Sequence, residues 1–437
     1  MSTSSENSLS LIEEYYEEQI IRCMKCGMCQ SICPVYYEDS LETGCARGKL
    51  ALSEALLHGK LEPNHKIEMI FNKCLLCHAC AQVCPVGLSP DKVFAAARAE
   101  MVKRYDMPWI KSLIYRKLLG EGKLASLTGT LSLANRLKLF VLARSLSIPK
   151  MFGKSAIRLS FATLPDIPSK PFLDRFPELL EPNSKPIGTV GYFVGCAQNS
   201  VFQDVSEASV NILLALGYRV IIPKDQGCCG FPHYGAGDFE TLKQKIIQNS
   251  SAFKKYKLDA IIISCATGGS GLKEVYPEIT KEDNLKTLGA NVYDISEFLA
   301  LKHLDDLKKM MPTDKKEKIK ITYHDACHLN RLQGISSQPR QLLSIMPSYE
   351  LVEMENSTKC CGEGGGFTFY YQDISSSIAN RKKETIKNTG AKVVALGCPG
   401  CRAQISGALK QEGLDIDTKH TVCLLWDEIK KGKDSNF

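Results

Sequence analysis

Two groups of cysteines in the sequence have the types and spacing of metal ligands. Adjacent cysteines precede a glycine at Cys360-Cys361-Gly362, and the same arrangement stands at Cys228-Cys229-Gly230. Two neighbouring thiolates can bind neighbouring irons, and glycine lets the backbone approach a bulky group closely. Further cysteines accompany each pair. The candidate ligands are Cys196, Cys228, Cys229 and Cys265 in the first group, and Cys327, Cys360, Cys361, Cys398 and Cys401 in the second.

Two cysteine runs near the N-terminus share another spacing. In each run two, two and three residues separate the cysteines and a proline follows, as in bacterial two-cluster ferredoxins. There, three cysteines of a run bind one 4Fe–4S cluster and the fourth binds the other cluster. A pair of zinc sites is the alternative, but zinc does not need this crossed pattern. We therefore predict two cubane 4Fe–4S clusters, held by Cys23, Cys26, Cys29 and Cys84 and by Cys74, Cys77, Cys80 and Cys33.

The elements that position these runs are expected to be helices. Apolar residues recur at helical spacing over residues 48–58, between the two runs, which predicts a mainly α-helical ferredoxin domain over residues 1–100. Cys45 is interpreted as a small buried hydrophobe rather than a ligand. His78 is expected to lie beside a cluster without binding it.

Residues 101–187 are predicted to form a basic amphipathic connector. Twelve Lys or Arg residues between positions 103 and 158 face only two acidic ones, a local charge of +10 in a chain of net charge +7. The rest of the chain is therefore slightly acidic, and nucleic acid is poorly supported as a partner. A solvated face is one interpretation of the connector. Docking onto an acidic partner subunit or an anionic membrane surface is the other.

From residue 188 onward, strands and helices alternate, and the pattern occurs twice. Strands are expected at 189–194, 219–222 and 260–263, and again at 320–323, 351–354 and 393–396, each leading toward a cysteine. Matching cysteines lie 131 to 133 residues apart, which indicates an internal duplication. We expect two α/β lobes, 188–310 and 311–437, that face each other with cysteines at the carboxyl ends of their strands. The fold class is thus α+β multidomain.

Composition limits the compartment and the number of domains. The chain has 437 residues, 44% of them apolar, so two or three domains with ordinary cores are expected. Nineteen cysteines are too many for a cytosolic chain of this size unless they bind metal. The first 19 residues are polar and acidic, unlike a signal peptide, and no apolar run reaches the length of a membrane span. We expect a soluble, cytoplasmic protein that can associate peripherally with a membrane.

Together, the crossed ferredoxin runs, the connector and the repeated Cys-Cys-Gly (CCG) lobes resemble the family of soluble iron–sulfur subunits that serve glycolate oxidase and D-lactate dehydrogenase. Similar lobes occur in heterodisulfide reductase, where five cysteines of each CCG domain hold a noncubane 4Fe–4S cluster. The resemblance implies such a cluster in the second lobe, which has all five. In the first lobe Gly268 stands where the fifth cysteine would be. Whether that lobe holds a further cluster stays open.

Four other polar residues lie near the cysteines. His324 and His328 flank Cys327, His233 follows the first Cys-Cys-Gly, and Glu363 follows the second. Hydrogen bonding to cluster sulfur is favoured for the histidines over a proton relay. Glu363 is interpreted either as a proton donor or as a solvated loop residue.

The resemblance implies an electron-transfer subunit without a substrate of its own. A separate FAD-containing dehydrogenase subunit would oxidise a 2-hydroxy acid, lactate or glycolate. Electrons would then pass through the clusters to a quinone, an electron-transferring flavoprotein or another carrier. The alternative is an enzyme that resembles heterodisulfide reductase and reduces a disulfide at the noncubane cluster. The missing cysteine of the first lobe disfavours this alternative, because a catalytic pair of clusters would be expected to be complete.

Overall fold

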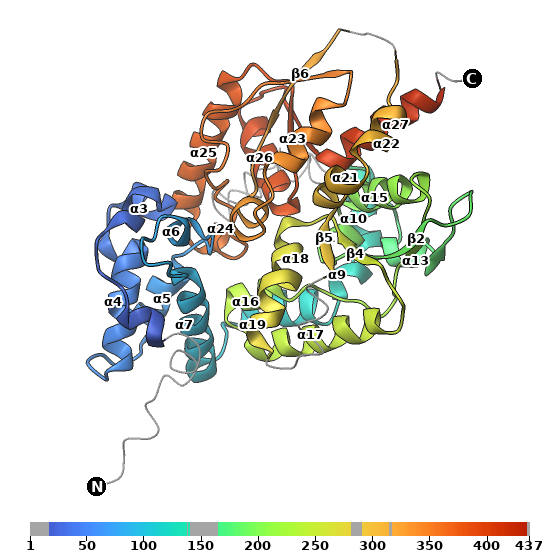
Figure 1. The fold of residues 1–437 in the computed structure, drawn as a ribbon. Coiled ribbons are helices and arrows are strands. Elements are labelled where there is room, and N and C mark those ends of the chain that lie inside the picture. Colours follow the sequence, from blue (N-terminus) through green and yellow to red (C-terminus); the bar gives the residue numbers. More distant parts are fainter. Residues whose placement is uncertain (1–16, 138, 140–164, 281–290, 314–316, 435–437) are drawn as a thin grey trace.

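The N-terminal part of the chain is helical (Figure 1). The structure is a computed structural model that describes residues 17–137, 139, 165–280, 291–313 and 317–434. We call residues 17–105 the dicluster domain. Its elements are α2 (Met28–Ile32), α3 (Pro34–Asp39), η1 (Glu42–Gly44), α4 (Ala46–Leu57), α5 (His65–Asn72), α6 (Ala79–Gln82) and α7 (Pro90–Tyr105).

Helix α7 is the centre of this domain. Proline at its first position suits the start of a helix, and every residue from Val93 to Met101 is buried. α4 and α5 pack against α7 on one side and the first lobe packs on the other. Asn64 begins α5 by accepting hydrogen bonds from the backbone N–H groups of Lys66 and Ile67. The helix expected at residues 48–58 is confirmed as α4, which begins two residues earlier than expected.

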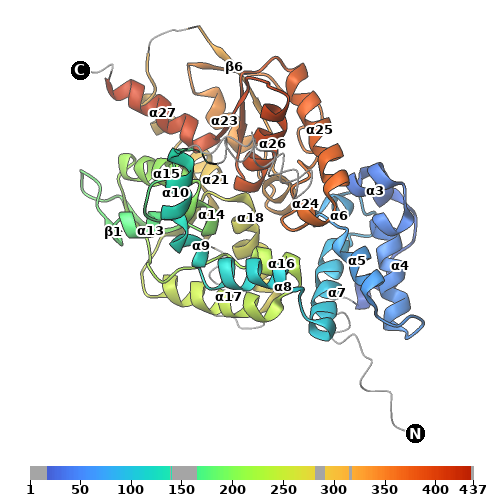
Figure 2. The ribbon, with the colours of Figure 1, turned by 180° about the vertical axis from the view of Figure 1, so that it is seen from behind.

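Short helices continue the chain along the first lobe. They are α8 (Trp109–Ser112), the π-helical η2 (Leu113–Gly120), α9 (Lys123–Ser126) and α10 (Thr128–Arg136). Figure 2 shows them lying over the first lobe, where α9 packs on α14 and η2 packs on α16 and α17. A large part of the expected connector, residues 140–164, lies outside the described residues.

The first lobe contains a five-stranded sheet in the order β1-β3-β2-β4-β5. All pairs are parallel except β1 with β3. The strands are β1 (Leu179–Leu180), β2 (Gly188–Phe193), β3 (Tyr218–Ile221), β4 (Ala260–Ile263) and β5 (Val292–Asp294). The helices are α13 (Phe172–Arg175), α14 (Cys196–Ser200), α15 (Gln203–Ala215), α16 (Phe231–Ala236), α17 (Phe239–Lys254), α18 (Ala266–Ser270), η4 (Gly271–Val275), α19 (Tyr276–Ile279), α21 (Ile295–Lys302) and α22 (Leu304–Lys309).

The second lobe has the same arrangement without the antiparallel edge strand. Its four parallel strands follow the order β7-β6-β8-β9. This order matches β3-β2-β4-β5 and agrees with a duplication. The strands are β6 (Ile319–Tyr323), β7 (Tyr349–Leu351), β8 (Val393–Leu396) and β9 (Asp417–His420). The helices are η5 (His328–Leu332), α23 (Ser337–Ser344), α24 (Phe367–Tyr370), α25 (Gln372–Asn388), α26 (Pro399–Gln411) and α27 (Thr421–Asp434).

The two lobes share one apolar core. α15 of the first lobe packs against α27 of the second, and α21 packs against α23. Side chains from both sheets, including Tyr192 and Tyr323, belong to a single buried cluster. The lobes therefore face each other and bring the loops after β4 and β8 together: Ala266 N donates to Gly397 O over 3.0 Å. No helix within the described ranges is long and apolar enough to cross a bilayer.

Candidate metal centres

The first ferredoxin-type group lies around one small cavity at the outer side of the dicluster domain. The cavity is lined by all four cysteines predicted for the first cluster and also by Cys80. Lys25 and Gly27 have left-handed backbone conformations (φ 55° and 86°), which turn the chain tightly between the ligands. Cys26 is an exposed residue, so this site reaches solvent. The predicted ligands are Cys23, Cys26, Cys29 and Cys84.

In the second ferredoxin-type group Cys77 and Cys80 are buried and Cys74 is partly buried, and Cys33 lies within the group. Cys33 precedes α3 and accepts a hydrogen bond from Tyr36 N, which turns its thiol back toward the second run. Cys33 interacts electrostatically with Cys74, and Cys80 interacts with Cys33, Cys74 and Cys77. Burial raises the pKa of Cys33 to about 11 and that of Cys77 to about 12. The structure thus brings together the four cysteines of the crossed assignment, whose role as ligands stays a prediction.

Two buried cations stand beside this second group, and the sequence analysis missed both. Lys49, 1% exposed, donates to the carbonyls of Thr43 (2.8 Å) and Gly44 (2.6 Å) and interacts with Cys74 and Cys33. Burial lowers its pKa, although the nearby thiols oppose this shift. The Arg98 guanidinium donates to the Cys74 carbonyl over 2.6 Å. Buried positive charge of this kind suits a site that carries thiolates and a negatively charged cluster.

In the second lobe, contacts between thiols link all five predicted cysteines. Cys327 contacts Cys360, Cys360 contacts Cys361, and Cys401 contacts both Cys361 and Cys398. The Cys361 and Cys401 sulfurs are 3.2 Å apart. Cys327 and Cys398 follow β6 and β8 at their carboxyl ends, as expected for parallel strands. Five soft sulfur donors in one buried place fit an iron–sulfur cluster.

The glycines after Cys361 let this loop approach the dicluster domain. Gly362, Gly364 and Gly365 all have positive φ. A Cβ atom on Gly364 would come within 2.4 Å of the Leu75 side chain, which lies between two cysteines of the second ferredoxin run. The glycines therefore serve a close approach between domains. Glu363 accepts a hydrogen bond from Gly365 N (2.8 Å) and so takes part in the loop structure.

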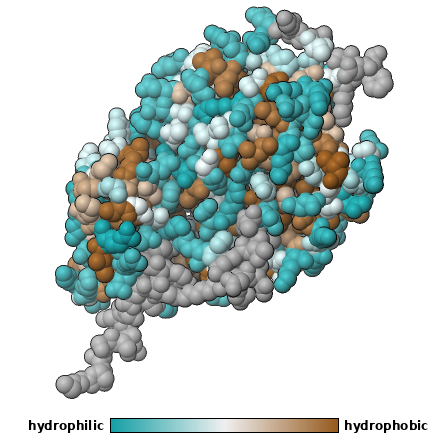
Figure 3. Space-filling model, in the orientation of Figure 1, coloured by the Kyte–Doolittle hydropathy of each residue, from teal (hydrophilic) through white to brown (hydrophobic). Residues whose placement is uncertain are grey.

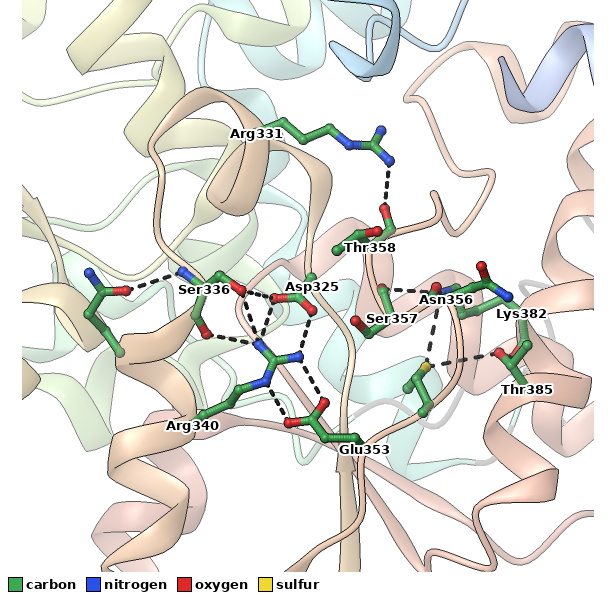
Figure 4. Close-up of polar contacts among 12 residues, drawn as sticks. Asp325, Arg331, Ser336, Arg340, Glu353, Asn356, Ser357, Thr358, Lys382 and Thr385 are labelled. Atoms are coloured by element: carbon green, nitrogen blue, oxygen red, sulfur yellow. Dashed lines mark hydrogen bonds and ion pairs between the residues drawn. The ribbon is translucent and has the colours of Figure 1, made fainter. Parts of the chain in front are cut away.

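Polar contacts hold the loops that carry the second-lobe cysteines (Figure 4). Arg340 makes a two-fold ion pair with Asp325 (2.9 and 2.8 Å), which lies between His324 and Cys327. The buried amine of Lys382 donates to the carbonyls of Asn356 (2.7 Å) and Ser357 (3.2 Å), in the loop before Cys360. Burial lowers the pKa of Lys382 to about 8.

The second ferredoxin-type group lies against the second lobe. Cys77, Cys327 and Cys360 belong to one packed cluster of side chains. Arg331 of the second lobe donates to the Cys77 carbonyl over 3.1 Å. His328 joins all three parts of the molecule, because its ring nitrogens contact Leu76 O of the dicluster domain and Thr267 Oγ1 of the first lobe, both at 3.1 Å.

The first lobe brings its cysteines together less completely. Cys196 contacts Cys228, and Cys228 contacts Cys229. The strongest charge interaction of the Cys265 thiol is with Cys398 of the second lobe. Gly268 stands where the second lobe has Cys401, and a Cβ there would meet the Ile263 side chain at 2.7 Å. Next to Cys196 and Cys228 lies a cavity of about 700 Å³, bordered by η2, α9 and the first lobe.

The remaining residues of interest have structural partners. His78 contacts Asp91 through Nδ1 (3.0 Å), and His233 contacts Tyr115 O through Nε2 (2.9 Å). Cys45 is buried, as expected, and its thiol donates to Glu42 O over 3.2 Å. Cys45 also contacts Cys29, a neighbour that sequence spacing did not reveal.

Several basic residues of the connector are used within the chain. Lys111 is 6% exposed and donates to Ala236 O over 3.1 Å. Arg116 pairs with Asp106 (2.9 Å) and Asp238 (3.2 Å). These two side chains hold the connector on the first lobe and are not available as a charged docking surface.

Comparisons with known proteins agree with this arrangement. The family model described as a cysteine-rich domain (CCG) matches residues 190–273 and 321–406, and the one described as a 4Fe-4S dicluster domain matches residues 19–88. The chain is 28% identical over 425 residues to the probable glycolate oxidase iron-sulfur subunit of Bacillus subtilis, covering 94% of this chain and 95% of that protein.

Two other relatives have different names. A fumarate reductase (CoM/CoB) subunit of Methanothermobacter marburgensis is 30% identical over 419 residues, covering 94% of this chain and 73% of that protein. Lactate utilization protein A of Oceanobacillus iheyensis is 30% identical over 241 residues, covering 54% of this chain and 96% of that protein. The expected fold class and iron–sulfur clusters are confirmed, whereas the number and type of clusters stay predictions.

Proposed function

Because the chain belongs to the family of iron–sulfur proteins that join a 4Fe-4S dicluster domain to a duplicated cysteine-rich domain, we propose that it is the electron-transfer subunit of a flavoprotein 2-hydroxy-acid dehydrogenase complex. An FAD-containing partner would oxidise lactate or glycolate. This chain would accept the electrons and pass them to a quinone, an electron-transferring flavoprotein or another carrier. The names of the relatives from Bacillus subtilis and Oceanobacillus iheyensis support this function.

The proposal rests on the spatial arrangement of the cysteine groups. Cys26 of the first group is exposed, whereas Cys77 and Cys80 of the second group are buried. Cys77 in turn packs with Cys327 and Cys360 of the second lobe. Clusters at these three places would form a row from the surface to the interior, along which electrons could pass between neighbouring clusters. The bound clusters would supply the one-electron steps, and the protein would keep the inner two away from water.

The partner is proposed to dock at the first group. Three large apolar side chains near Cys26 are exposed by 51 to 66%: Ile21, Met24 and Met28. Figure 3 shows tan and brown surface on the dicluster domain, at the left. An apolar surface beside an exposed ligand suits an electron-transfer partner, because it excludes water from the contact.

We propose two cubane 4Fe–4S clusters in the dicluster domain and one noncubane 4Fe–4S cluster in the second lobe. The contacts among the five thiols support the latter. For the first lobe we propose no cluster of this kind, since Gly268 supplies no ligand. Residues 1–100, 101–187, 188–310 and 311–437 remain our proposed domains, although α7 extends to Tyr105 and strand β1 at Leu179–Leu180 pairs with the first-lobe sheet. We propose that the complex lies in the cytoplasm or at a membrane surface.

A second function is supported by the relative from Methanothermobacter marburgensis, whose name includes CoM/CoB. In that case the chain would itself reduce a disulfide at the second-lobe cluster. The incomplete ligand set of the first lobe argues against it.

The purified chain should be assayed with lactate or glycolate and a dye acceptor, alone and with the flavoprotein that co-purifies with it. Dye reduction only in the presence of the flavoprotein would support the electron-transfer subunit. Disulfide reduction by the isolated chain, with a reduced dye as donor, would support the second function. Hydroxy-acid oxidation by the chain alone would contradict both.

A further inference from the structure

His324 is a buried histidine whose ring has no hydrogen-bond partner among the described residues. It follows β6, where its backbone N–H continues the sheet by donating to Ala395 O over 2.9 Å. The residue is 0% exposed. Within the described part of the chain, neither ring nitrogen has a hydrogen-bond partner, since the nearby Ser357 backbone lies outside hydrogen-bonding geometry. Burial removes the hydrogen bonds that the ring would make with water, and no protein group replaces them. A buried polar ring of this kind is expected to have another partner.

The ring points to the second-lobe cysteines. One ring nitrogen of His324 and the sulfurs of Cys361 and Cys401 all lie within 4.8 Å of one another. With metal–nitrogen and metal–sulfur bonds of about 2.0 and 2.3 Å in a tetrahedral site, ligand atoms on one metal stand about 3.5 Å apart. Because a cluster iron also binds inorganic sulfide, a small side-chain adjustment would place the ring nitrogen and one of these thiolates on the same iron.

Comparison of the two lobes supports a link between His324 and Cys401. When Cys327 is matched with Cys196, His324 corresponds to Phe193, which is buried and stacked on Phe253 at 5.8 Å between ring centres. Cys401 corresponds to Gly268. The first lobe therefore keeps four of the cysteines but lacks both His324 and Cys401. If His324 and Cys401 bind the same iron, a lobe that lacks this iron needs neither residue.

We propose that His324 is a nitrogen ligand of the second-lobe iron–sulfur cluster, on the iron that also binds Cys401. The proposal rests on the presence of a cluster in that lobe, which is part of the proposed function. Imidazole is neutral whereas thiolate is negative, so this ligand lowers the negative charge of the cluster. As in other iron–sulfur centres with histidine ligands, it raises the reduction potential.

The test is nitrogen hyperfine spectroscopy on the holoprotein, with 15N introduced into histidine alone. Iron analysis comes first: about twelve irons per chain indicate a second-lobe cluster beside the two cubanes, and about eight would overturn both the cluster and this ligand. With the cluster present, we expect a strong 15N coupling, which the two cubanes cannot give because their predicted ligands are all cysteines. A cluster with only weak couplings would make His324 a hydrogen-bond donor and overturn the proposal, while leaving the proposed function intact.

Two variants assign the signal. His324→Phe introduces the side chain that the first lobe has at this position, and it should abolish the strong coupling. His328→Asn removes the other histidine near Cys327 and should preserve the coupling, because both ring nitrogens of His328 already have partners. Loss in His328→Asn with retention in His324→Phe would overturn the assignment. If His324→Phe loses iron, His324→Cys is the second variant: a thiolate ligand should restore about twelve irons and lower the reduction potential, and failure to restore them counts against ligation.

Discussion

The guanidinium of Arg331 donates a hydrogen bond from Nη1 to the carbonyl oxygen of Cys77, 3.1 Å away, across the boundary between the second lobe and the dicluster domain. Its Nη2 donates to Thr358 O over 2.8 Å, in the loop that leads to Cys360. The same side chain interacts electrostatically with the thiols of Cys77, Cys327 and Cys360. One buried cation thus lies between the ligands of two predicted clusters.

Replacement of Arg331 by Gln should lower the reduction potentials of the two neighbouring clusters. A nearby positive charge stabilises the reduced, more negative form of a cluster, and at an effective dielectric of about 20 the loss corresponds to roughly 50–100 mV. Redox titration followed by electron paramagnetic resonance measures the change. Lys387→Gln, at an exposed site on α25, is the matched control and should shift the potentials much less. Equal shifts in both variants would contradict this role.

Crossed ligation predicts which cluster depends on Cys33. Its thiol lies near Cys74 rather than in the cavity of the first group. Replacement of Cys33 by Ser should therefore perturb the cluster of Cys74, Cys77 and Cys80, with the solvent-exposed cluster intact. Cys84→Ser is the reciprocal control and should perturb the exposed cluster. Spectra that show the opposite pattern would exclude the crossed assignment.

The buried amine of Lys111 should make the stability of the protein depend on pH. Burial lowers its pKa from 10.5 to about 8. Between these values the unfolded chain binds the proton that the folded chain has released, so the contribution of Lys111 to stability rises with pH, by at most about 3 kcal/mol. We expect the melting temperature of Lys111→Met, relative to the unaltered protein, to fall progressively from about pH 8 to about pH 10.5. Lys117→Met, at a side chain that is 56% exposed, should show no such trend. Parallel curves for Lys111→Met would contradict the prediction.

The sequence predicted the cysteine groups and the duplication because spacing along the chain carries both. The strands at 260–263 and 393–396 agree with β4 and β8, since each is a short apolar run that is buried. The strand expected at 351–354 is instead β7 at Tyr349–Leu351. Strand β9 was not predicted, because Asp417–His420 is polar and alternates between buried and partly exposed positions.

The buried cations could not be found in the same way. Arg331 acts on Cys77, 254 positions away, and Arg98 acts on Cys74, 24 positions away, in each case through a backbone carbonyl. Every residue has a backbone carbonyl, so no sequence pattern shows which carbonyl accepts a hydrogen bond from a buried cation. For Lys49, a charged residue within the apolar stripe of α4 was the available signal. For His324, its position before Cys327 was visible, but its lack of partners was not.

The two CCG lobes should differ in chemistry. The second lobe joins five thiols in one chain of contacts, whereas in the first lobe Cys265 interacts most strongly with Cys398 across the lobe boundary and Gly268 supplies no ligand. Replacement of Cys361 by Ser should remove about four irons per chain and abolish electron transfer to the acceptor. The matched variant Cys229→Ser, at the corresponding first-lobe position, should leave the iron content at about twelve and reduce transfer much less. Iron analysis, together with anomalous scattering at the iron edge, measures both results. A cluster beside Gly268, or none beside Cys360 and Cys361, would contradict this difference between the lobes.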